Sequence, residues 1–150
     1  MRLNEEVLSS LLQRALEIEN NNSQILLKYF ISEENSRRRE MIYTILKECE
    51  YSKSLLKEWI KELKGKIPLE TQIRDLHFEN MYIKEKLNFL RRVCEVIKDY
   101  YSFLMNDLKK IEPGTVIENE KIEKLLRDIE KLIKAKEKHL KMIDEIWEFS

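Results

Sequence analysis

Apolar residues recur along the chain at intervals of three and four, the spacing of an α-helix that buries one face. The pattern predicts four long helices, over residues 4–31, 34–64, about 81–108 and 118–149. Each would be roughly 40–45 Å long at 1.5 Å per residue. Helices of similar length that each carry one apolar stripe bury those stripes most simply as a four-helix bundle. We therefore predict an all-α protein with a single domain over residues 1–150.

Glycine and proline are rare in the chain, with two of each, and they mark the expected breaks. Gly65 is predicted to be the C′ residue of the second helix, and Pro113 and Gly114 predict a tight turn before the fourth helix. The apolar pattern continues at helical spacing through residues 68–80. We interpret this stretch as a long, partly helical crossover between the second and third helices.

Charge and composition exclude several classes of function. The chain has 28 Lys and Arg against 28 Asp and Glu, so its net charge of zero favours neither a nucleic acid nor an anionic membrane as partner. Two glycines leave no material for a phosphate-binding loop, a dinucleotide-binding loop or a nucleophile elbow, which excludes kinases and hydrolases. Two histidines cannot supply the ligands of a haemerythrin-like iron site.

The compartment can also be predicted from composition. No run of apolar residues is long enough to cross a membrane, and the start of the chain lacks the apolar core of a signal peptide. Two cysteines do not form a disulfide framework, so we expect a protein of the reducing cytoplasm. Heavy use of Lys and Glu with only three Gln is typical of thermophilic organisms.

Polar or sulfur-bearing residues interrupt each apolar stripe near the middle of its helix. From the first helix to the fourth they are Glu19 and Asn22, Cys49 and Ser52, Cys94 and Tyr101, and Lys136 and His139. Since all of them lie near helix midpoints, we expect them to meet in one layer of the bundle. A cysteine in such a position is most often a small buried apolar residue.

This layout resembles the ferritin-like superfamily, in particular the rubrerythrin-type di-iron carboxylate bundles. The segments that carry the resemblance are ALEIE ending at Glu19, MIYTILKECEYS over residues 41–52, the Cys94-x6-Tyr101 spacing, and KEKHL over residues 136–140. The resemblance implies a four-helix fold with six metal ligands, one Glu from each of two helices and a Glu-x-x-His from each of the others. The six matching positions hold Glu19, Cys49, Ser52, Cys94, Lys136 and His139.

Only Glu19 and His139 are of the residue types that the resemblance requires. An ammonium at the position of Lys136, where the family has a bridging carboxylate, repels the two cations. A buried Lys needs a carboxylate partner, so we predict a Lys136–Glu19 ion pair joined by Asn22, Tyr101 or Ser52. The expected function is then a structural or interaction module with a degenerate di-iron site, without cofactor and not an enzyme.

The alternative is a metal-binding oxidoreductase or iron-handling protein with a rearranged site. Its iron or zinc would be held by Glu19, His139, Cys49 and Cys94, helped by a carboxylate such as Glu48 or Glu137. Metal content distinguishes the two hypotheses.

The third helix has more apolar residues than one core needs. Phe89, Val93, Val96, Tyr100 and Phe103 widen its apolar face. Such a face is covered either by the crossover or by another subunit. We expect a homodimer through the third helix, and the sequence identifies no other protein partner.

Overall fold

The computed structural model describes residues 4–111 and 119–150, and its regular elements in that part of the chain are all helical. They are α1 (Glu5–Ser32), α2 (Ser36–Glu62), the short 3-10 helix η1 (Phe78–Asn80), α3 (Ile83–Lys109) and α4 (Asn119–Glu148). The predicted all-α class and the four long helices are confirmed, and the helix ends differ from the predicted ones by at most two residues. The turn predicted at Pro113 and Gly114 lies outside the described residues.

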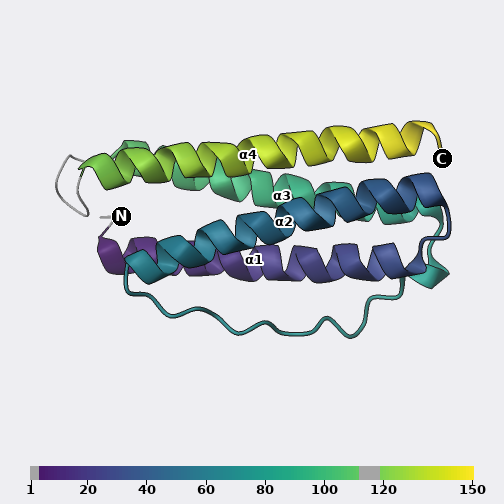
Figure 1. Cartoon of the computed structure of the whole chain (residues 1–150), viewed down its shortest axis with the longest axis horizontal. Helices are drawn as coiled ribbons and strands as arrows, with labels where there is room; N and C mark the ends of the chain where they lie inside the picture. Colours follow the sequence, from purple (N-terminus) through teal and green to yellow (C-terminus); the bar gives the residue numbers. More distant parts are fainter. Residues whose placement is uncertain (1–3, 112–118) are drawn as a thin grey trace.

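The four helices pack side by side as two antiparallel pairs (Figure 1). α1 packs along α2 and α3 packs along α4, while α1 also contacts α3 and α2 also contacts α4. α1 and α4 therefore lie on one diagonal of the bundle, and α2 and α3 lie on the other. None of the helices in the described part of the chain has both the length and the apolar character needed to cross a membrane.

Asparagine side chains cap the helices of the first pair. The side-chain oxygen of Asn4 accepts the backbone N–H of Val7 at 2.8 Å, and that of Asn35 accepts the N–H of Arg38 at 3.0 Å. Each bond satisfies one of the donors that a helix start leaves without an intrahelical partner. The caps set where α1 and α2 begin.

The crossover from α2 to α3 runs the length of the bundle beside α1 (Figure 1), and its helical part is limited to η1. The crossover, which was expected to be partly helical over residues 68–80, is helical only over the last three residues of that range. A helix over the 20 residues 63–82 would reach only about 30 Å, whereas the 27-residue α2 is about 40 Å long. Extended chain rises more than 3 Å per residue, so a largely extended connection can reach the far end.

Side chains of α1 hold the crossover in place. The amide of Gln13 donates to the carbonyl oxygen of Lys66 at 2.7 Å, and the side-chain oxygen of Gln24 accepts the N–H of Ile73 at 2.8 Å. The amide of Gln24 also donates to the carbonyl oxygen of Thr71. These bonds satisfy backbone groups that an extended segment without a neighbouring strand would leave to water.

The cap at the end of α2 corrects the role predicted for Gly65. Lys64, with φ of 58°, occupies the left-handed C′ position. Its N–H donates to Lys61 and the N–H of Gly65 donates to Ile60, at 3.0 and 2.8 Å. This is a Schellman motif with Gly65 one residue further on, at C″.

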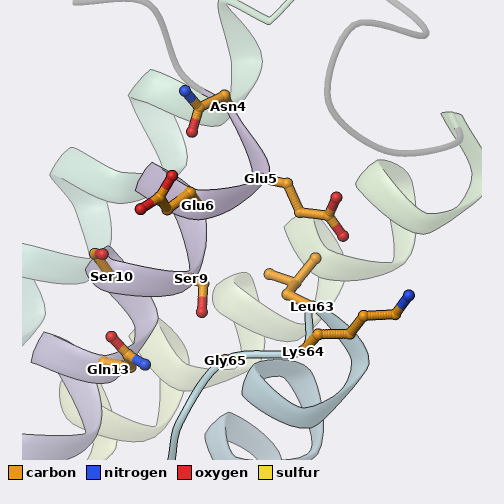
Figure 2. A pocket seen from close by; sticks show the side chains of 9 residues that line it. All are labelled: Asn4, Glu5, Glu6, Ser9, Ser10, Gln13, Leu63, Lys64 and Gly65. Atoms are coloured by element: carbon orange, nitrogen blue, oxygen red, sulfur yellow. The ribbon is translucent and has the colours of Figure 1, made fainter.

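Gly65 is required by its contact with α1 (Figure 2). A Cβ atom at this position would lie 2.0 Å from the hydroxyl oxygen of Ser9 and 3.1 Å from a methyl carbon of Ile60. The Ser9 hydroxyl is buried and has no hydrogen-bond partner in the described residues. A pocket of about 660 Å³ opens beside this contact, lined by the first turns of α1 and the α2 cap.

We expect Gly65→Ala to destabilise the protein by about 1–3 kcal/mol, because the added methyl group overpacks the contact with Ser9. Ser9→Ala alone should be nearly neutral, since it removes a buried hydroxyl without a partner. The double variant should recover most of the loss in urea unfolding. Ser10→Ala is the matched control, because Ser10 is exposed on the same turn and should rescue nothing.

Candidate functional site

A layer of polar side chains divides the apolar interior of the bundle into two clusters. One cluster contains Leu12, Leu56, Leu104 and Leu132 among its members, and the other contains Ile25, Ile45, Leu90 and Ile143 among its members. On each helix of the bundle, the polar residues predicted from the sequence lie between or at the edges of these clusters. We call this set the polar layer: Glu19, Asn22, Cys49, Ser52, Cys94, Tyr101, Lys136 and His139.

Lys136 and Glu19 form a fully buried ion pair at the centre of the polar layer. The Nζ atom of Lys136 lies 3.0 Å from Oε1 and 3.1 Å from Oε2 of Glu19, and both side chains are 0% exposed. Burial opposes the charged form of Lys136, but the charge and hydrogen bond of Glu19 together with the neighbouring Cys49 and Cys94 outweigh burial, so the pKa of Lys136 is raised. The ammonium therefore remains charged across the physiological pH range.

Tyr101 completes the environment of the carboxylate from α3. Its hydroxyl donates to Oε1 of Glu19 at 2.5 Å, and the ring is fully buried. Burial and the neighbouring charge of Glu19 raise the pKa of Tyr101 well above its usual value. Glu19 thus receives a hydrogen bond from α3 and an ion pair from α4, which joins three helices at one carboxylate.

The two cysteines are free, buried thiols. The Sγ atom of Cys49 lies 3.5 Å from Nζ of Lys136 and accepts a hydrogen bond from the amide of Asn22 at 3.4 Å. The thiol of Cys94 donates to the carbonyl oxygen of Lys136 at 3.4 Å. Burial raises the pKa of Cys49 to about 12 and that of Cys94 to about 11. Nucleophilic attack and metal binding both need the thiolate, so these raised pKa values disfavour either reaction at neutral pH.

Ser52 is buried in the same layer but forms its hydrogen bond within its own helix. Its hydroxyl donates to the carbonyl oxygen of Glu48 at 3.2 Å. The sequence predicts Ser52 as one of three residues that could join the ion pair. The structure brings Tyr101 to Glu19 and Asn22 to Cys49, and it leaves Ser52 outside this network.

His139 lies at the edge of the layer and contacts Glu48 of α2. Its Nε2 atom is 2.7 Å from Oε2 of Glu48. The other oxygen of Glu48 forms an ion pair with the ammonium of Lys138. The imidazole is 1% exposed, and its Nδ1 atom has no partner in the described residues. Burial and the charge of Lys136 lower the pKa of His139 to about 4, against the opposing effect of Glu48.

These contacts do not fit the rearranged metal site. His139 contacts Glu48, and the Glu19 carboxylate is bonded by Lys136 and Tyr101. In the described part of the chain, no three His, Cys, Asp or Glu residues are arranged to share a metal ion. The structure therefore does not assemble Glu19, His139, Cys49 and Cys94 as a ligand set.

Two further buried polar contacts involve residues outside the positions predicted from the sequence. The indole N–H of Trp59 donates to Asp128 at 2.8 Å, linking α2 to α4. The hydroxyl of Tyr29 donates to Glu33 at 2.9 Å, and Glu33 also accepts a hydrogen bond from the guanidinium of Arg38. Asp128 lies one turn after Leu125 in the apolar stripe of α4, and this interruption was the signal that could have found it.

The polar layer is closed to solvent. A pocket of about 300 Å³ on the outside of α1 and α2 is lined by Leu27, Tyr43 and Lys47 among others, and the pocket at Gly65 lies at the bundle end. Neither pocket is lined by a residue of the polar layer. A small molecule in either pocket would not contact the ion pair.

No family model, no curated protein and no solved structure matches this chain. A proposal for the function therefore rests on the geometry of the polar layer and its buried ammonium.

Proposed function

We propose that the protein is a ferritin-like bundle of the rubrerythrin type in which a metal-free Lys–Glu contact occupies the place of the di-iron site. Its role is structural or that of an interaction module, and it is not catalytic. The observation that carries the proposal is the position of Lys136. Its ammonium is fully buried against both carboxylate oxygens of Glu19, at a position matching a bridging carboxylate of the family.

The connectivity supports the same proposal. Two antiparallel helix pairs are joined by a crossover that runs the length of the bundle, so that α2 and α3 point in the same direction on opposite corners (Figure 1). This is one of the two common ways to connect a four-helix bundle, and ferritin-like folds use it with a single long crossover.

The chemistry of the layer supports a structural role. Each helix contributes one side chain to a connected set: Glu19 from α1, Cys49 from α2, Tyr101 from α3 and Lys136 from α4. A buried charge pair adds little net stability, but it penalises any register that separates the partners. The protonated thiols, the charged ammonium and the burial of the layer support a structural role.

Metal analysis tests the proposal directly. We expect protein purified without chelator to contain far less than one Fe, Mn or Zn per chain, because the Lys136 ammonium repels a cation beside Glu19. Elemental analysis by mass spectrometry measures this content. One metal ion per chain, removable by chelator, would contradict the proposal.

The converse experiment restores the family's ligand types at three of the substituted positions. Lys136→Glu combined with Cys49→Glu and Ser52→His should bind Fe(II) or Co(II) at least about tenfold more tightly than the natural chain, since carboxylates and imidazole suit these ions. Lys134→Glu is the matched control, because Lys134 is exposed on the same helix and pairs with Glu130. Equal metal affinity in the triple variant and this control would count against the ferritin-like assignment, provided that circular dichroism shows both to be folded.

A further inference from the structure

The outward face of α3 carries a row of apolar residues spaced seven positions apart. Tyr82, just before the helix, is 80% exposed, Val96 is 61% exposed and Phe103 is 62% exposed. Phe89, at the same spacing, is partly buried. A seven-residue repeat of apolar side chains is the pattern by which one helix packs along another.

The chain itself covers only one edge of this face. Val93 and Tyr100 pack against the bundle's own core, and the hydroxyl of Tyr100 donates to the carbonyl oxygen of Leu11 at 2.6 Å. Phe89 packs edge-on against Phe78 of η1. The wide apolar face expected from the sequence is therefore narrower, and Val96 and Phe103 remain as its uncovered centre.

Two opposite charges lie on the exposed side of this row. Arg92 is four residues before Val96 and Asp99 is three residues after it, and both are exposed. Neither side chain forms an ion pair or hydrogen bond with another residue in the described ranges. Val96 is the middle residue of α3, which begins at Ile83 and ends at Lys109.

We propose that a second copy of this chain packs its α3 antiparallel to this one, about a two-fold axis at Val96. In this arrangement the two Val96 side chains meet, Phe89 lies opposite Phe103 of the second copy, and Arg92 lies opposite Asp99 of the second copy. Each of the last two contacts is made twice, as the symmetry of a homodimer requires.

The charges select the antiparallel orientation. A parallel pairing would place Arg92 against Arg92 and Asp99 against Asp99, which are repulsive contacts. At the ends of the antiparallel pair, Glu85 lies opposite Asp107 of the second copy and one turn from its Lys110, so repulsion there is offset. The net charge of the chain is zero, so two copies do not repel each other at long range.

Sedimentation equilibrium of the full chain and its variants tests the dimer and its orientation. The natural chain should be a dimer, and Phe103→Glu should make it monomeric by placing a charge in the apolar row. Arg92→Asp and Asp99→Arg should each raise the dimer Kd by roughly tenfold or more, because each places like charges together twice. Glu58→Lys, on an exposed position of α2, is the control and should leave the Kd unchanged.

Mixing the two charge-reversed chains distinguishes orientation from a general loss of stability. An equimolar mixture of Arg92→Asp and Asp99→Arg chains should form a heterodimer with a Kd near that of the natural dimer, because opposite charges face each other again. A monomeric natural chain would overturn the proposal, and so would a mixture that associates no better than its components. Neither result would bear on the metal-free polar layer, which lies inside each chain.

Discussion

Glu19→Gln is expected to reduce the free energy of unfolding by about 3–5 kcal/mol, because it leaves the buried ammonium of Lys136 without a carboxylate. The amide is close to the carboxylate in size, so the change removes charge and creates no cavity. Urea unfolding at neutral pH and at one fixed protein concentration measures the loss, since association would make the midpoint depend on concentration.

The matched control is Glu17→Gln, at a position two residues before Glu19 on the same helix. Glu17 pairs with Arg14 at 3.0 Å, but these side chains are 44% and 63% exposed. An exposed pair contributes about 0–1 kcal/mol, so this variant should unfold at nearly the natural urea concentration. Similar losses in Glu19→Gln and Glu17→Gln would refute the buried ion pair.

Replacing both partners of the ion pair separates its effect on stability from its effect on the register of the helices. Glu19→Leu combined with Lys136→Met should be more stable than Glu19→Gln, because no unpaired charge remains in the core. If the pair holds the helices in register, this double variant should unfold with a smaller dependence on urea, which reports a less uniquely packed native state. A double variant as unstable as Glu19→Gln would show that the cost does not come from the unpaired ammonium.

Features that depend on a single helix, such as which residues face the interior, were predicted well from the sequence. Helical periodicity locates each apolar stripe and each interruption of it, so the depth of Glu19, Asn22, Cys49 and Lys136 in the interior followed from spacing alone. Charge completed the inference for the central pair, because a buried ammonium needs a carboxylate and Glu19 is the inward acid at matching depth.

Contacts and backbone conformations that depend on two elements packing together could not be predicted from residue spacing. Glu48 lies outside the stripe of α2 and contacts His139 only because α2 and α4 are neighbours. Gly65 is needed where the chain approaches Ser9, 56 positions earlier in the sequence. The crossover has apolar residues at helical spacing, but the distance it must cover requires extended backbone, and that distance is set by the length of the finished bundle.

A second large effect is expected from pH. Between pH 6.5 and about 4 the free energy of unfolding should fall by about 1.4 kcal/mol per pH unit, to a total of about 3 kcal/mol. The imidazole of His139 is buried near the ammonium of Lys136, so its pKa in the folded protein is lowered to about 4. The unfolded chain takes up a proton near pH 6.5, which the folded chain does not, and protons therefore favour unfolding in this window.

His139→Gln tests whether this imidazole is the cause, because a glutamine amide can still donate to Glu48 but does not titrate. The variant should lose the slope between pH 6.5 and 5, measured as urea midpoints in a pH series. Below that range Glu33 and Glu48 contribute as well, since their pKa values are lowered and protonation removes their stabilising contacts. His77→Gln is the control, because His77 is exposed in the crossover, outside the polar layer. A slope that survives in His139→Gln would assign the proton uptake to another group and contradict a buried, neutral histidine in the polar layer.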